Sequence, residues 1–393
     1  MKIKILELFG GIGSCTKAFK RLGIPHKVVD YVEIDKYAVK SYNAINDTNF
    51  EPQDITTWDK DIEIDLIMHG SPCQDFSLAG KQAGGDKDSG TRSSLMYETI
   101  RIVEKLKPKY VIWENVKNLL SKKHIHNFNA YLETMEQLGY TSYYQVLNAK
   151  DYGIPQNRER IFTISIRKDI NKIFTFPQPQ ELKLKLKDML ENEVDEKYYL
   201  SEKNINYICG NAINKELKDV YDREKALFNK NIAYTISTKQ DRRIGDSNFV
   251  IENYEDELTV KDYLTIRNNT KKGYLEARDG DGCYITNIDK KRGTVQKEMI
   301  PTLKTSPDIG VVVNKLRIRK LTPKECWRLM GFDDEDCDKA AQVNSNTQLY
   351  KQAGNSIVVN VLEAILTNLL LKTNQEISKG QMTIFDYEEN IWK

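Results

Sequence analysis

Short apolar runs alternate with amphipathic segments through the first 176 residues of the chain. The runs have the length and composition of β-strands, and they are Ile3–Leu8, Val28–Glu33, Leu66–His69, Tyr110–Glu114 and Ile161–Ile166. Segments between them, such as Ser94–Leu106, place apolar side chains near the helical period. This alternation predicts an α/β domain with a parallel sheet and helices on both faces. Ligands of such sheets bind at the carboxyl ends of the strands.

The alternation stops at Phe176–Gln180, and the chain is then polar and irregular to about residue 315. A small domain of short strands, or a set of long loops, is expected there. A regular pattern returns at Leu321–Met330, where Thr322 is a good N-cap in front of Pro323. Val358–Leu371 has the length and pattern of a helix that packs on a sheet, and the residues after it are expected to form a loosely held tail.

The composition excludes several classes of protein. The net charge of +2 excludes a wholly basic coat for nucleic acid but allows a basic cleft. The six cysteines form no Cys-x-x-Cys pair and the four histidines no ligand cluster, so no metal site is expected. We find no secretory signal, and apolar stretches fall short of the roughly 20 residues of a membrane span. A cytoplasmic protein with reduced thiols is expected.

A glycine-rich turn follows the first expected strand. The segment Phe9-Gly10-Gly11-Ile12-Gly13-Ser14 leads into a helix, and glycine at such a turn lets the backbone approach a ligand closely. The next strand ends at Glu33, where a carboxylate can bind ribose hydroxyls, and Asp54 is a third candidate after a further strand region. The spacing differs from the Gly-x-Gly-x-x-Gly of dinucleotide enzymes. It predicts a nucleoside-like cofactor, with a purely structural turn as the alternative.

Three chemically active groups lie at the ends of expected strands. Cys73 follows Pro72 beyond Leu66–His69, Glu114 ends the strand from Tyr110, and two arginines, 158 and 160, precede Ile161. Catalytic groups of α/β enzymes lie at such ends, and the fixed angle of a proline aims the neighbouring thiol. A lone cysteine is more often a small buried hydrophobe, and the other groups can be surface charges, so these alternatives stay open.

These motifs, in this order, resemble the DNA (cytosine-5) methyltransferase family. The matching segments are Phe9–Gly13, Gly70–Gln74, Glu114–Val116, Gln156–Arg160, Arg317–Cys326 and Gln352–Asn360. The resemblance covers about 1–176 and 316–371 and does not extend to 177–315. Gly10 stands where the family often has alanine, a difference expected to be harmless, and Ser93 stands where glycine is frequent.

The resemblance implies a Rossmann-like S-adenosylmethionine-dependent methyltransferase sheet with helices on both faces, plus a smaller, irregular, mostly β recognition domain. The catalytic and cofactor-binding domain would be discontinuous, with residues 1–176 and 345–373. Residues 177–315 would recognise the target, 316–344 would form a hinge with the late motif, and 374–393 a tail.

The resemblance also implies roles for individual residues. Cys73 would attack carbon 6 of a flipped-out cytosine, Glu114 would act at N3, Arg160 would contact the cytosine oxygen, and Arg158 would hold a phosphate or the catalytic loop. Implied contacts to S-adenosylmethionine are Phe9, Gly11, Ile12, Gly13, Glu33, Ile34, Asp54, Ile55, Pro72, Asn355 and Ser356. Implied or candidate DNA contacts are Gln74, Ser77, Arg92, Gln240, Arg242, Arg243 and Thr302. Gly80–Arg92 has the composition of a loop that closes over the substrate, with an ordinary surface loop as the alternative.

We expect a monomeric enzyme with double-stranded DNA as its partner, and a cognate restriction endonuclease is a further expected partner. Two alternatives stay open: an RNA cytosine-5 methyltransferase with the same motifs, and a catalytically silent DNA-binding protein. The glycine spacing disfavours a nicotinamide oxidoreductase. The DNA target sequence is not evident from these residues.

Overall fold

The computed structural model divides the chain into two compact units. The first unit comprises Met1–Asn192, Thr302–Pro307 and Leu321–Lys393, and the second Glu193–Pro301 and Asp308–Lys320. The residues that the structure describes are 2–72, 95–199, 263–284, 293–303, 309–313 and 317–373. The first unit is discontinuous, because segments beyond residue 301 return to the N-terminal part of the chain. The functional domain boundaries given above stay predictions.

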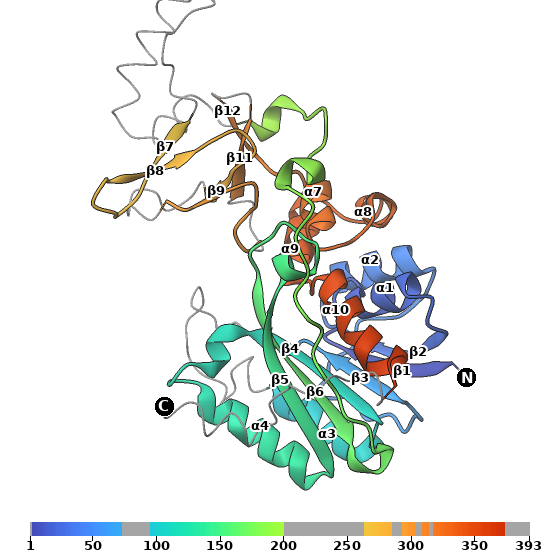
Figure 1. Ribbon diagram of the computed structural model, residues 1–393. Coiled ribbons are helices and arrows are strands. Elements are labelled where there is room, and N and C mark those ends of the chain that lie inside the picture. The colour runs from blue at the N-terminus through green and yellow to red at the C-terminus, as the bar shows by residue number, and fades with distance from the viewer. Residues whose placement is uncertain are drawn as a thin grey trace, which may run out of the picture. The chain divides into compact units, whose positions relative to one another are not determined.

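A six-stranded sheet forms the centre of the first unit (Figure 1). Its strands are β1 (Ile3–Leu8), β2 (His26–Val32), β3 (Leu66–His69), β4 (Tyr110–Val116), β5 (Tyr140–Asn148) and β6 (Glu159–Arg167). The order across the sheet is β2-β1-β3-β4-β6-β5. The first four of these strands are parallel, while β6 runs antiparallel to both β4 and β5. The predicted α/β class is confirmed, and the sheet is mixed.

The expectation of a wholly parallel sheet was therefore wrong at its far edge. The connection between β5 and β6, residues 149–158, is too short for a parallel crossover, which needs a dozen residues or more. The strand β5 was not predicted, because its buried and exposed residues are mixed along its length and it has no apolar run. No strand lies between residues 47 and 65, which corrects the strand region expected before Asp54.

Helices cover both faces of the sheet because successive strand side chains point to opposite sides. Leu6 and Leu8 of β1 join the core cluster that contains Met96 of α3 (Met96–Leu106) and Phe128 of α4 (Ile125–Gln137). Glu7, between those leucines, instead accepts a hydrogen bond from a side chain of α1 (Ser14–Arg21). The next helix, α2 (Lys36–Asn46), follows β2.

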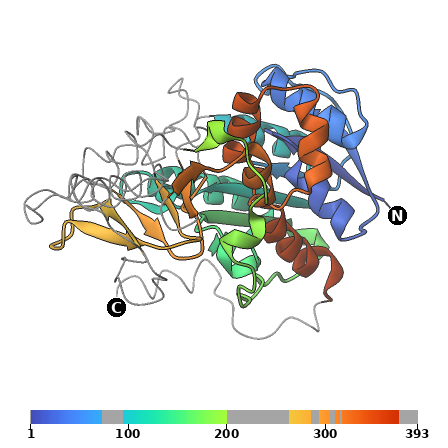
Figure 2. The ribbon, with the colours of Figure 1, turned by 90° about the horizontal axis from the view of Figure 1, so that it is seen from above.

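The C-terminal segments pack on this N-terminal framework. They form α7 (Pro323–Arg328), α8 (Asp334–Ala341), α9 (Asn346–Asn355), α10 (Val359–Leu366) and a π-helical turn, Thr367–Leu371. Figure 2 shows these orange and red helices beside the blue N-terminal ones, where α10 contacts α1 and α8 contacts α2. The predicted start of α7 is confirmed, since Thr322 and Glu325 form a reciprocal capping box.

The stretch Asn346–Leu371 is long and apolar enough to cross a membrane by length and composition, contrary to the expectation from the sequence. Half of its most apolar window is buried inside the protein. Because Val359, Ile365 and Leu369 are fully buried, we interpret the stretch as a core element of the first unit.

Short antiparallel strands make up most of the regular structure in the described part of the second unit. A four-stranded sheet has the order β10-β9-β11-β12, and β7 pairs with β8. Their bounds are β7 (Leu264–Arg267), β8 (Tyr274–Ala277), β9 (Gly282–Tyr284), β10 (Val295–Gln296), β11 (Ile309–Val313) and β12 (Arg317–Lys320). The expected mostly β character is confirmed.

Candidate active site

The glycine turn between β1 and α1 has an unusual backbone. Phe9, Gly11 and Gly13 all have positive φ angles, of 53°, 54° and 85°. Gly13 is the N-cap of α1, and no side chain caps the helix. A Cβ placed on Gly11 would meet nothing within 4 Å, so this stretch of backbone is open on that side. A polar ligand can therefore approach the main chain here.

Glu33 is bound to this turn. Its Oε2 accepts a hydrogen bond from the Gly11 amide at 3.1 Å, and its Oε1 accepts one from the Asp35 amide at 2.9 Å. Burial raises the pKa of Glu33, against the effect of these backbone hydrogen bonds. The next residue, Ile34, is 68% exposed, which is high for a large apolar side chain. A carboxylate and an apolar face thus lie side by side at the end of β2.

Asp54 and Ile55 lie in the loop that follows α2. The Asp54 carboxylate accepts hydrogen bonds from the amide and hydroxyl of Thr56, at 2.9 and 2.8 Å, and so supports a local turn. Ile55 is packed in the core, so only its backbone is available to a ligand. The side chain of Ile12 is likewise buried.

The last matching segment, Gln352–Asn360, meets the glycine turn at the start of α1. The hydroxyls of Ser14 and Ser356, both buried, are 3.1 Å apart and within hydrogen-bond distance. Asn355, at the end of α9, is exposed. The structure thereby brings together residues that are more than 340 positions apart in the chain.

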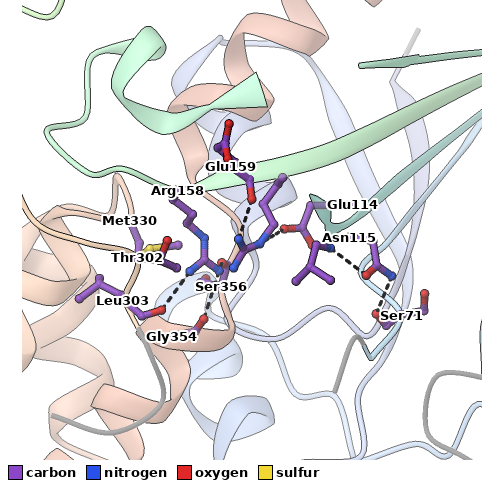
Figure 3. Close-up of polar contacts among 12 residues, drawn as sticks. Ser71, Glu114, Asn115, Arg158, Glu159, Thr302, Leu303, Met330, Gly354 and Ser356 are labelled. Atoms are coloured by element: carbon purple, nitrogen blue, oxygen red, sulfur yellow. Dashed lines mark hydrogen bonds and ion pairs between the residues drawn. The ribbon is translucent and has the colours of Figure 1, made fainter. Parts of the chain in front are cut away.

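The ends of β3 and β4 are fastened to each other. The Trp113 indole donates to the Ser71 hydroxyl at 2.9 Å. The Asn115 amide is 3.5 Å from the Ser71 carbonyl oxygen, as Figure 3 shows. A Cβ added to Gly70 would lie 3.8 Å from Oε2 of Glu114. The Glu114 carboxylate is therefore next to the backbone that leads, three residues later, to Cys73.

Glu114 forms an ion pair with Arg160. The distance from Oε1 to Nε is 3.1 Å, and the two side chains are 12% and 17% exposed. Burial raises the pKa of Glu114, while Arg160 and Arg158 oppose that rise. The two side chains come from adjacent antiparallel strands, where Val116 pairs with Arg160. A carboxyl group held in this way can keep a proton more readily than one in water.

Arg158 is turned into the protein. It is 4% exposed, and its guanidinium donates to the carbonyl oxygens of Leu303, Gly354 and Ser356 at 3.2, 3.1 and 2.8 Å (Figure 3). The sequence predicted that Arg158 holds a phosphate or the catalytic loop, whereas in the structure these donors bind carbonyl oxygens of the chain itself. The guanidinium instead joins three separate segments of the first unit.

Gln156 has a structural role that its sequence motif did not predict. This fully buried residue donates to the Leu329 carbonyl oxygen at 2.7 Å and accepts from the Leu303 amide at 3.2 Å. Thr302 donates its hydroxyl proton to the Asn157 carbonyl oxygen at 2.7 Å. A sequence pattern could have indicated this role: the Gln156–Arg160 motif carries polar side chains at alternate positions next to a buried strand.

Several predicted residues lie outside the described part of the chain. They are Cys73, Gln74, Ser77, Arg92, Gln240, Arg242 and Arg243, together with Ser93 and the segment 80–92. Pro72, the last described residue before this gap, is partly buried. Among the residues that the structure describes, no group of three or more His, Cys, Asp or Glu side chains is arranged to hold a metal ion.

The fold and these contacts together define a class of protein. A glycine turn with a bound carboxylate, beside a carboxyl–guanidinium pair at neighbouring strand ends, is typical of an α/β enzyme with a nucleoside cofactor.

Comparison with known proteins gives the family. The model for the C-5 cytosine-specific DNA methylase family matches residues 3–371. The type II methyltransferase M2.ScrFI of Lactococcus lactis subsp. cremoris is 33% identical over 93% of this chain and 99% of its own length. The orphan methyltransferase M.SPRI of Bacillus phage SPR is 31% identical, over 94% and 98%. The solved structure of the Entamoeba histolytica methyltransferase EhMeth shares the fold, with a TM-score of 0.56 and 18% identity over 95% of this chain and all of that one.

The chain belongs to the C-5 cytosine-specific DNA methylase family. It is therefore a DNA (cytosine-5) methyltransferase, and its family uses S-adenosylmethionine as the methyl donor. This assignment sets aside the oxidoreductase, the silent DNA-binding protein and the RNA enzyme.

Proposed function

We propose that this enzyme methylates carbon 5 of cytosine within one specific duplex DNA sequence and that Cys73 is its nucleophile. The observation that carries this proposal is the position of the Glu114–Arg160 pair. The Glu114 carboxylate of this pair lies next to Gly70, three residues before Cys73 in the chain. A thiol, a carboxyl group and a guanidinium would then face one pyrimidine.

The residues around the glycine turn fit a nucleoside cofactor. Glu33 is partly buried, bound to the turn and suited to ribose hydroxyls, and the exposed face of Ile34 suits the adenine. Asp54 and the backbone of Ile55 would bind the rest of the adenine. Phe9, Gly11, Ile12 and Gly13 would surround the methionine end, with Pro72, Asn355 and Ser356 from neighbouring segments. Bound S-adenosylmethionine supplies the methyl group.

Cys73 would activate the cytosine. An ordinary thiol has a pKa of about 8.5, so at neutral pH only a small fraction is thiolate. Addition of the sulfur to carbon 6 forms a carbon–sulfur bond and moves electron density to carbon 5 and N3. After methylation of carbon 5, a base removes the proton from that carbon. Breaking of the carbon–sulfur bond then restores the ring and releases Cys73.

Glu114 would manage the charge that develops at N3. Because burial raises its pKa, the carboxyl group can hold a proton and share it with N3 as the sulfur adds. Arg160, 3.1 Å from the same carboxyl group, would fix its orientation and contact the cytosine oxygen. We assign Arg158 a positioning role, since its donors bind carbonyl oxygens of this chain.

The target base must leave the helix to reach such a site. We propose that the segment 80–92 closes over it, with Gln74, Ser77 and Arg92 contacting DNA. Residues 177–315 would read the sequence, with Gln240, Arg242, Arg243 and Thr302 as candidate contacts. We further propose a monomeric cytoplasmic enzyme with a restriction endonuclease of the same specificity as its partner.

Replacement of Cys73 by serine tests the central proposal. The Cys73→Ser variant should bind S-adenosylmethionine as the wild type does but transfer no methyl group to duplex DNA. Wild-type enzyme should form a denaturation-resistant adduct with DNA that carries 5-fluorocytosine, because fluorine cannot leave carbon 5 as a proton does. Mapping of 5-methylcytosine in expressing cells that lack cytosine methylation identifies the target sequence. Methyl transfer by Cys73→Ser at the wild-type rate would refute the assignment.

A further inference from the structure

Two stacked tyrosines lie directly under the glycine turn. Tyr31 of β2 and Tyr42 of α2 are buried, with ring centroids 3.9 Å apart and planes inclined by 27°. A Cβ on Gly10 would lie 2.6 Å from the Tyr31 ring, and one on Gly13 would lie 2.8 Å from the Tyr42 ring. The rings therefore fill the space that larger residues in the turn would need. At Gly10, whose φ is not positive, this close approach is the requirement for glycine.

The Tyr31 hydroxyl also holds the main chain of the turn. It donates to the Gly11 carbonyl oxygen at 2.5 Å, while the Gly11 amide donates to Glu33 at 3.1 Å. Gly11 thus has both of its backbone groups bound by side chains at the end of β2. Because Gly11 has no side chain and can adopt many conformations, these two bonds restrict it strongly.

The tyrosine pair is itself anchored to the sheet. The Tyr42 hydroxyl is 3.1 Å from the hydroxyl of Thr16, which donates to the buried carboxyl group of Glu7 on β1. Burial raises the pKa of Tyr31 well above its usual range, so its hydroxyl stays protonated and remains a donor. The turn therefore rests on a support built from β1, β2, α1 and α2 (Figure 1).

We propose that Tyr31 is a positioning residue that fixes Gly10 and Gly11 in the conformation that binds S-adenosylmethionine, and that Gly10 is glycine because the Tyr31 ring occupies the place of a side chain. The proposal rests on the proposed cofactor site at this turn. A contact of 2.6 Å between carbon atoms requires the ring or the turn to move.

The Tyr31→Phe variant removes only the hydroxyl. We expect the Kd and the KM for S-adenosylmethionine to rise about fivefold, which corresponds to about 1 kcal/mol, the usual contribution of one hydrogen bond. The kcat and the KM for DNA should stay close to the wild-type values. Tyr140→Phe is the matched control, because this equally buried tyrosine also donates to a carbonyl oxygen, that of Pro108 at 2.7 Å. The control should leave cofactor binding unchanged.

A double-mutant cycle tests the claim that the Tyr31 ring occupies the place of a side chain at position 10. Gly10→Ala should weaken cofactor binding at least tenfold in the wild type but much less in a Tyr31→Ser background, where the space is free. Additive effects would overturn the steric claim. Thermal unfolding of each variant shows whether it is folded; if Tyr31→Ser is not, Gly10→Ala alone must still lower cofactor affinity.

Glu33→Ala distinguishes a failure of the proposed cofactor site from a failure of the positioning role of Tyr31. If this change leaves cofactor affinity intact, the proposed cofactor site is wrong. If Glu33→Ala weakens binding while Tyr31→Phe behaves as the control does, the site stands and the role of Tyr31 is refuted.

Discussion

Glu7 should make the stability of this enzyme depend on pH in a direction that is unusual for a carboxyl group. The residue is 1% exposed under the glycine turn, and burial raises its pKa from 4.5 to about 7, against the hydrogen bond from Thr16. Between these two pH values the folded protein keeps a proton that the unfolded chain has lost. The free energy of unfolding therefore falls as pH rises from 4.5 to 7.

The size of the effect follows from the two pKa values. Each pH unit of difference corresponds to about 1.4 kcal/mol, so ionised Glu7 destabilises the fold by roughly 3 kcal/mol at pH 8 relative to pH 4.5. Glu7→Gln removes the titration while retaining an oxygen that can accept the Thr16 bond. If the amide of Glu7→Gln changes the free energy of unfolding by a constant amount, that amount does not affect the comparison, because only the pH dependence of the wild type and of Glu7→Gln is compared.

Urea unfolding between pH 5 and pH 8 measures this difference. Relative to Glu7→Gln, the wild type should lose stability steadily up to about pH 7 and then no further. Glu63→Gln is the control, because it removes a carboxylate that is 87% exposed and forms a surface ion pair with Lys4. Parallel pH profiles for wild type and Glu7→Gln would show that Glu7 ionises normally and that the reasoning is wrong.

Two further predictions concern the active site and the core beneath it. Glu114→Gln should lower kcat for methyl transfer by about 100-fold to 10,000-fold, since the amide cannot transfer a proton to N3, with unchanged cofactor Kd by calorimetry; an unchanged kcat would exclude the proton role. His69 is fully buried and stacked on Trp113, and burial lowers its pKa to about 3. Below about pH 6.5 the unfolded chain binds a proton at His69 that the folded protein does not bind. The free energy of unfolding of the wild type should therefore fall by about 1.4 kcal/mol per pH unit, relative to that of His69→Asn, as the pH falls from 6.5. Acid unfolding profiles that coincide would contradict this.

Features that depend on near neighbours in the chain were predictable. The segments predicted as strands at Ile3–Leu8 and Leu66–His69 matched β1 and β3 residue for residue, because both are short, mostly apolar and followed by a glycine within two residues. The capping box at Thr322 and Glu325 was foreseen in part, since the cap residue and the proline stand together in the sequence. The turn Phe9–Gly13 was also evident, because its glycines lie between a strand and a helix.

Other features depended on partners far away in the sequence. The strand β5 escaped notice because it lies at the edge of the sheet, where partial exposure interrupts the apolar pattern. The arginine at 158 resembled a ligand for phosphate, but carbonyl groups from residues 303, 354 and 356 surround it once the chain is folded. Nothing local distinguishes such an arginine from Arg160, which pairs with Glu114.

By itself the sequence determined the class of fold, the family and the identity of the chemical groups, because these follow from local patterns and from the order of the motifs. Only the tertiary structure decided which groups meet: Glu33 with Gly11, Glu114 with Arg160, and the Tyr31 ring with Gly10. The physical reason is that hydrogen bonding and packing act over a few ångströms in space, and the residues that come that close are set by the folded chain rather than by its local composition.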